Sequence, residues 1–119
     1  MRCQTPAVAL YALAVAASSL LSACRSAPSL TEQEAAGKQL YLGRCAHCHE
    51  DNDLALKKAP PDLHHLFDQS KLPSGDLAND GEVRRAVLAG KGMMPAFTGR
   101  FNDEQMAALL AYLHTGLRQ

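Results

Sequence analysis

Cys45-Ala46-His47-Cys48-His49 is the stretch that decides the fold of this 119-residue chain. Two cysteines separated by two residues and followed at once by a histidine form the signature for covalent attachment of a c-type haem. The two thiols add across the porphyrin vinyl groups as thioethers, and the two-residue gap spans the distance between those vinyls. The histidine then falls under the iron and binds it through an imidazole nitrogen. The motif predicts one covalent haem c held by Cys45 and Cys48, with His49 as an axial iron ligand.

Zinc binding and a redox disulfide are the other uses of cysteines at this spacing. A zinc site needs a second pair of ligands at a similarly short spacing. The other histidines include no such pair; they are His47, His64, His65 and His114. A thioredoxin-like pair needs a strand–helix setting around it, and no convincing strand precedes the motif. Zinc and a disulfide therefore remain the weaker alternatives.

The amino terminus predicts export and a lipid anchor. Residues 7–21 form an uncharged, mostly apolar run behind a short start that contains Arg2. This run has the length of a signal-peptide core and is shorter than a transmembrane helix of about 20 residues. It ends in Leu21-Ser22-Ala23-Cys24, which resembles the lipobox of bacterial lipoproteins. The resemblance implies cleavage before Cys24 and acylation there by a diacylglyceryl group and palmitate-like chains. The alternative is an ordinary cleaved signal peptide.

The charge balance argues against nucleic-acid partners. The chain has 12 basic and 12 acidic residues, and cleavage after residue 23 removes only Arg2 among them, which leaves 11 basic side chains. A protein that binds DNA or RNA needs a basic surface for the phosphate backbone. We therefore expect no nucleic-acid binding.

Helical signals account for most of the remaining chain. Residues 31–34 (Thr-Glu-Gln-Glu) match a capping box at the start of a helix that leads to the motif. Residues 82–89 have the pattern of a short amphipathic helix that ends at Gly90. Asn102 can cap the last helix, whose apolar residues recur at the spacing of one buried face: Met106, Leu109, Leu110 and Leu113. No alternating apolar pattern of useful length appears, so the predicted fold class is all-α.

A second axial ligand is predicted from the loop of residues 90–97 (Gly-Lys-Gly-Met-Met-Pro-Ala-Phe). Its glycines let the backbone pass close to a porphyrin, and its proline stiffens a loop that must hold a weak thioether–iron bond. Met94, next to the proline, is the predicted ligand, and Met93 is the alternative. A histidine could replace methionine, and His64 and His65 are then the candidates.

With these features in this order, residues 31–117 resemble class I cytochrome c, in the small bacterial monohaem group. Gly37 and Tyr41 stand eight and four residues before the first motif cysteine, where that family keeps a glycine and an aromatic residue. The resemblance implies that the first helix crosses the last at Gly37, against Tyr112. It also implies that the Pro61 carbonyl accepts a hydrogen bond from Nδ1–H of the haem histidine. The implied fold is three to five helices wrapped around one covalent haem.

The chain departs from the family pattern at two points. It has no tryptophan, which many relatives use to bind a haem propionate, so Tyr41, Tyr112 or Arg100 would have to serve. It also lacks a lysine-rich face, which argues against partners that recognise a strong positive patch. The predicted domains are a cleaved lipoprotein signal peptide (1–23), a lipidated tether (24–30) and a cytochrome c domain (31–119).

The predicted function is single-electron transfer between respiratory or periplasmic partners, without enzymatic activity. Two filled axial positions leave no open iron site for a substrate. The expected donor is a dehydrogenase or a quinol-oxidising complex, and the expected acceptor is an oxidase or reductase. The expected location is a bacterial membrane, through the lipid anchor, facing the periplasm or the exterior. The alternatives are an electron-entry subunit of one oxidoreductase complex, and a haem enzyme or gas sensor with a labile sixth ligand.

Overall fold

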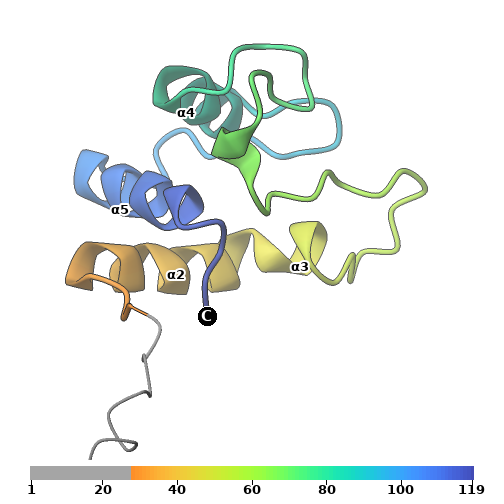
Figure 1. Cartoon of the computed structure of the whole chain (residues 1–119). Helices are drawn as coiled ribbons and strands as arrows, with labels where there is room; N and C mark the ends of the chain where they lie inside the picture. The colour runs from red at the N-terminus through yellow and green to blue at the C-terminus, as the bar shows by residue number, and fades with distance from the viewer. Residues whose placement is uncertain (1–27) are drawn as a thin grey trace, which may run out of the picture.

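The structure, a computed structural model, describes residues 28–119. Its helices, labelled in Figure 1, are α2 (Glu32–Arg44), α3 (Ala46–His49), α4 (Asp80–Ala89) and α5 (Asp103–His114), and a 3-10 turn, η2 (Leu66–Asp68), lies between α3 and α4 in the sequence. The described residues contain no β-strand and only two isolated β-bridges. The all-α class predicted from the sequence is therefore confirmed. The predicted signal peptide and the lipidation site Cys24 lie outside the described residues.

Helices α2 and α5 lie against each other and form one side of the molecule (Figure 1). Gly37 is the contact point: a Cβ atom there would lie 2.0 Å from the carbonyl oxygen of Ala108 and 2.9 Å from Cβ of Tyr112. Only a residue without a side chain allows two helices to come this close. One turn further along α2, the ring of Tyr41 packs on Tyr112 with 5.6 Å between the ring centroids. The crossing implied by the family resemblance is therefore confirmed.

Each of the two long helices begins with a capping box. Thr31 Oγ1 accepts the Glu34 N–H at 3.2 Å, and the Glu34 carboxylate accepts the Thr31 N–H at 2.7 Å. At the start of α5, Asn102 and Gln105 make the same reciprocal pair at 2.7 and 3.0 Å. These bonds satisfy backbone N–H groups that have no partner within a helix. The helix starts predicted at residues 31 and 102 are confirmed.

Helix α4 begins at Asp80, two residues before the predicted start at residue 82. The Asn79 side-chain oxygen accepts the Glu82 N–H at 3.0 Å and so caps the helix from further upstream. At the other end, the chain leaves the helix at Gly90, where φ is +73°. A left-handed backbone of this kind favours glycine, as the sequence predicted for this position.

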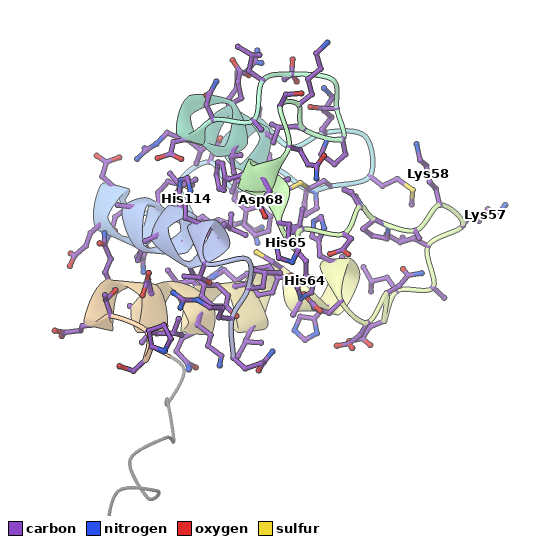
Figure 2. The ribbon with its side chains drawn as sticks, in the orientation of Figure 1. Lys57, Lys58, His64, His65, Asp68 and His114 are labelled. Atoms are coloured by element: carbon purple, nitrogen blue, oxygen red, sulfur yellow. The ribbon has the colours of Figure 1, made fainter. Side chains whose placement is uncertain are left out.

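A stacked pair of side chains joins η2, α4 and α5. The imidazole of His114, labelled in Figure 2, stacks on Phe67 with 3.7 Å between the centroids. Nε2 of the same ring lies 2.7 Å from a carboxylate oxygen of Asp80 at the start of α4. The end of α5 therefore holds the 3-10 turn and the first turn of α4 in one place.

The core lies between α5 and the elements around it. The predicted apolar face of α5 is buried, since Met106, Leu109, Leu110 and Leu113 are all at most 7% exposed. Tyr112 of α5 is buried as well, and the other large buried side chains come from α2, η2, α4 and the loops: Tyr41, Leu66, Leu72, Val83, Val87, Phe97 and Leu117. Among residues 28–119, no helix combines the length and the apolar character needed to cross a bilayer.

Candidate functional site

The motif occupies a single helical turn, α3, which follows α2 directly (Figure 1): Cys45 is its N-cap, and Cys48 and His49 lie within it. The N–H groups of Cys48 and His49 both donate to the carbonyl oxygen of Cys45, at 3.1 and 2.9 Å. Residues three and four positions apart on such a turn share one face. The turn therefore presents both thiols and the imidazole on the same side, as attachment of one planar cofactor requires.

Neither motif cysteine is engaged in a disulfide bond. Both are half-buried free thiols. Burial raises the pKa of the Cys45 thiol to about 11, against a smaller opposing effect of the Arg44 guanidinium. This thiol is therefore protonated at neutral pH when it is unreacted.

The part of the chain that the structure describes gives no support to the zinc and disulfide alternatives. Within the described range, residues 28–119, no three side chains of His, Cys, Asp or Glu gather closely enough to hold a metal ion. A structural zinc site needs four such ligands. Cys45 and Cys48 are also not bonded to each other.

The orientation of His49 is set by the loop that follows the motif. Its Nδ1 lies 2.8 Å from the carbonyl oxygen of Pro61. A carbonyl oxygen only accepts hydrogen bonds, so Nδ1 carries the proton and Nε2 keeps a free lone pair. The hydrogen bond implied by the family resemblance is present, and it leaves the metal-binding nitrogen of His49 available.

The two alternative histidine ligands make other contacts. Figure 2 shows His64 and His65 on the segment that leads into η2. Nδ1 of His64 lies 2.7 Å from the Asp62 carboxylate, and Nδ1 of His65 lies 2.8 Å from the Asp68 carboxylate. Both residues are exposed. Nothing in these contacts directs either ring towards the motif.

The backbone of the methionine loop is tightly held after α4. Lys91 and Met94 exchange both backbone hydrogen bonds, at 3.2 and 3.0 Å, and so close a turn. Gly90 lies so close to this turn that a Cβ atom on it would be 2.7 Å from the carbonyl oxygen of Met94. Beyond the turn, the N–H groups of Phe97 and Thr98 donate to carbonyl oxygens in the last turns of α4, at 3.1 Å each. The loop is therefore anchored at both of its ends.

The two methionines in this loop differ in burial. Met94 is half-buried and packs against the hydrophobic core, as does Cys45. Met93 is 65% exposed. A stable thioether–iron bond needs a sulfur held away from bulk water. The difference in burial favours Met94 over Met93 as the ligand.

One contact near the motif was not found from the sequence. The hydroxyl group of the buried Tyr41 donates to the Glu50 carboxylate at 2.5 Å. Burial, followed by this hydrogen bond and the carboxylate charge, raises the pKa of Tyr41. Because the tyrosine proton is committed to Glu50, Tyr41 is a poorer candidate for a haem propionate than Tyr112 or Arg100. Helical periodicity does not predict this contact, because the helix is interrupted at Cys45 between α2 and α3.

Comparisons with known proteins point to one family. A family model described as "Cytochrome C oxidase, cbb3-type, subunit III" matches residues 32–113. The chain is 33% identical over 90 residues to the Cbb3-type cytochrome c oxidase subunit FixPc of Rhizobium leguminosarum bv. viciae, which covers 76% of the chain and 29% of FixPc. It is 30% identical over 89 residues to cytochrome c6 of a Picosynechococcus species, which covers 72% of the chain and 75% of that protein. No solved structure gave a significant match.

Proposed function

Because the chain belongs to the class I monohaem cytochrome c family, to which the matched cbb3-type oxidase domain also belongs, we propose a specific ligand set and anchor for it. The protein is a cytochrome c electron carrier with covalently bound haem c. In our proposal Cys45 and Cys48 hold the haem, His49 and Met94 bind the iron, and Cys24 carries the lipid.

The residues present fit such a group. The thiols and the imidazole lie on one face of the turn formed by Cys45 and α3, and the free nitrogen of His49 is the one that a metal needs. When bound, haem c supplies one-electron chemistry between ferric and ferrous iron. The protein's part is to orient His49 through Pro61 and to hold Met94 on a stiff loop. The hydrogen bond between His49 and Pro61 is the observation that carries the assignment.

Filled axial positions favour electron transfer over enzymatic turnover. With both His49 and Met94 bound, the iron offers no open position to a substrate, a peroxide or a gas. Ligation by histidine and methionine also raises the reduction potential. The chain then acts through contact with redox proteins, a dehydrogenase or quinol-oxidising donor on one side and an oxidase or reductase acceptor on the other.

A subunit of one oxidoreductase complex is the second candidate. Its support is the match to FixPc, which is named as a subunit of a cbb3-type oxidase, although the chain spans only 29% of that protein's length. Purification in mild detergent distinguishes a free carrier from a subunit of a complex. A free carrier elutes alone and is reoxidised by added oxidase, whereas a subunit elutes with its complex at fixed stoichiometry.

Optical spectra of the oxidised and reduced holoprotein test the ligand set. A low-spin spectrum with the weak methionine-to-iron charge-transfer band in the red is expected for the oxidised protein. A low-spin spectrum without that band would instead indicate two histidine ligands. A high-spin spectrum would indicate the ligand-binding haem of an enzyme or sensor.

The Cys24→Ala variant tests the lipid anchor. We expect this variant to leave the membrane fraction, or to accumulate as an uncleaved precursor, because lipobox cleavage follows lipidation of the cysteine. Two acyl chains give stable anchoring where one is marginal. Membrane fractionation and the mass of the amino-terminal peptide provide the readouts. Cys3→Ala is the matched control, since Cys3 lies within the predicted signal peptide. Normal maturation and membrane attachment of Cys24→Ala would remove the lipoprotein assignment.

A further inference from the structure

We propose that Asp62 is a positioning residue that fixes the hydrogen bond between Pro61 and His49 and thereby lowers the reduction potential. This inference rests on the proposed role of His49 as an axial ligand. Asp62 does not touch His49 in the structure; its effect passes through the peptide group that joins it to Pro61.

That peptide group lies between two restrained residues. Its carbonyl oxygen, which belongs to Pro61, accepts the hydrogen bond from Nδ1 of His49 at 2.8 Å. On the Pro61 side, the pyrrolidine ring fixes φ. On the other side, Oδ1 of Asp62 accepts the N–H of His64 at 2.8 Å. A side-chain oxygen bonded to the backbone two residues on forms an Asx turn, which restrains the backbone of Asp62. The carbonyl that meets His49 therefore lies between two residues whose backbones are restrained.

The Asx turn is reinforced by a second donor. Nδ1 of His64 lies 2.7 Å from the same oxygen of Asp62. The backbone N–H of His64, and then its imidazole, lower the pKa of the Asp62 carboxyl below its usual value. Asp62 is therefore an ionised acceptor at neutral pH, which makes a stronger hydrogen bond than a neutral one. This gives His64 a role in the loop that does not require it to bind iron.

Geometry rather than charge is the route of action. The Asp62 side chain is 76% exposed, so water and salt screen its charge at the iron. The hydrogen bond to Pro61 is a direct link to the ligand. Donation from Nδ1–H makes the imidazole a stronger base, and a more basic ligand stabilises ferric iron. A loosened carbonyl weakens that donation and raises the potential.

Two neutral substitutions separate geometry from charge in the holoprotein. Asp62→Ala and Asp62→Asn remove the same negative charge, but only asparagine keeps an Oδ1 that can accept the His64 N–H. We expect Asp62→Ala to have a higher midpoint potential than Asp62→Asn. We also expect the Nδ1–H of His49 to exchange with deuterium roughly fivefold faster in Asp62→Ala, the factor for one hydrogen bond of ordinary net strength. Equal potentials and equal exchange rates in the two variants would overturn the proposal.

Asp62→Glu keeps the charge but moves the carboxylate out of reach of the Asx turn. This variant also tests the proposal if Asp62→Ala does not mature into a holoprotein. We expect a raised potential and faster exchange than in the parent, and a variant that matches the parent in both would overturn the proposal. The ferric proton NMR spectrum of the parent tests the underlying ligation separately. If His49 shows no haem-shifted ring proton there, the proposed ligand is wrong. If His49 does show such a proton, equal potentials and equal exchange rates in the variants reject only the role of Asp62.

Discussion

Gly37→Ala is expected to destabilise the folded protein by about 3 kcal/mol, at the upper end of the cost of overpacking a core. The new Cβ would lie 2.0 Å from the carbonyl oxygen and 2.6 Å from the carbonyl carbon of Ala108. Both are backbone atoms, which cannot turn aside as a flexible side chain can. Helices α2 and α5 would have to separate, and the packing of Tyr41 on Tyr112 would loosen with them. Denaturant unfolding of the holoprotein, followed by circular dichroism, measures the loss.

Gly43→Ala is the matched control on the same helix. A Cβ atom at Gly43 meets no other atom within 4 Å. Alanine is the better helix former by up to about 1 kcal/mol, so this variant should be as stable as the parent or more stable. Comparable losses at both positions would show that helix propensity or the denatured state governs the effect. A Gly37→Ala variant of parental stability would contradict the close helix crossing.

Met94→Ala is expected to give a folded holoprotein with a lower reduction potential and an open iron position. The thioether sulfur favours ferrous iron, so its removal stabilises the ferric state. External imidazole should bind more tightly because it no longer competes with the methionine. The affinity for imidazole should rise on the order of a hundredfold if the methionine leaves the iron position open about 1% of the time in the parent. Redox titration and imidazole titration followed by absorbance are the measurements.

Met93→Ala is the control for this ligand assignment. Met93 adjoins Met94 but is 65% exposed, so its removal should leave the potential and the charge-transfer band unchanged. If Met93→Ala changes them and Met94→Ala does not, Met93 is the ligand. If neither substitution has an effect, a histidine or an open position must be considered instead.

Local signals in the sequence predicted the helices well because those signals act over three or four residues. Each capping box and the apolar face of α5 can be found without knowing the tertiary structure. The start of α4 was predicted two residues too late because the local sequence there fits two structures. Asn79-Asp80-Gly81 has the composition of a turn as well as that of an N-cap and first helical turn. Only the bond from the Glu82 N–H to Asn79 distinguishes the two.

Contacts between distant segments could not be read from spacing. The crossing at Gly37 was implied by the family resemblance, because a glycine within a helix pattern does not reveal its partner. The bond from Tyr41 to Glu50 crosses a break between helices, so no period relates the two residues. The Asx turn of Asp62 spans only two residues and could have been predicted from an aspartate after a proline. Its link to His49 runs through the Pro61 carbonyl, whose hydrogen bond to His49 was implied by the family resemblance and not by spacing.

The attachment of the methionine loop to α4 makes ligand release a matter of local unfolding. Phe97 and Thr98 are bonded to backbone carbonyls at the end of α4, so the loop and the helix form one cooperative unit. If Met94 binds the iron as proposed, we expect its sulfur to leave the iron chiefly when that unit opens. Asn79, which caps the opposite end of α4, then contributes to the stability of the closed state although it lies far from the loop in sequence. Evolution could thus adjust how often the sixth position is vacant by changing a surface cap remote from the cofactor.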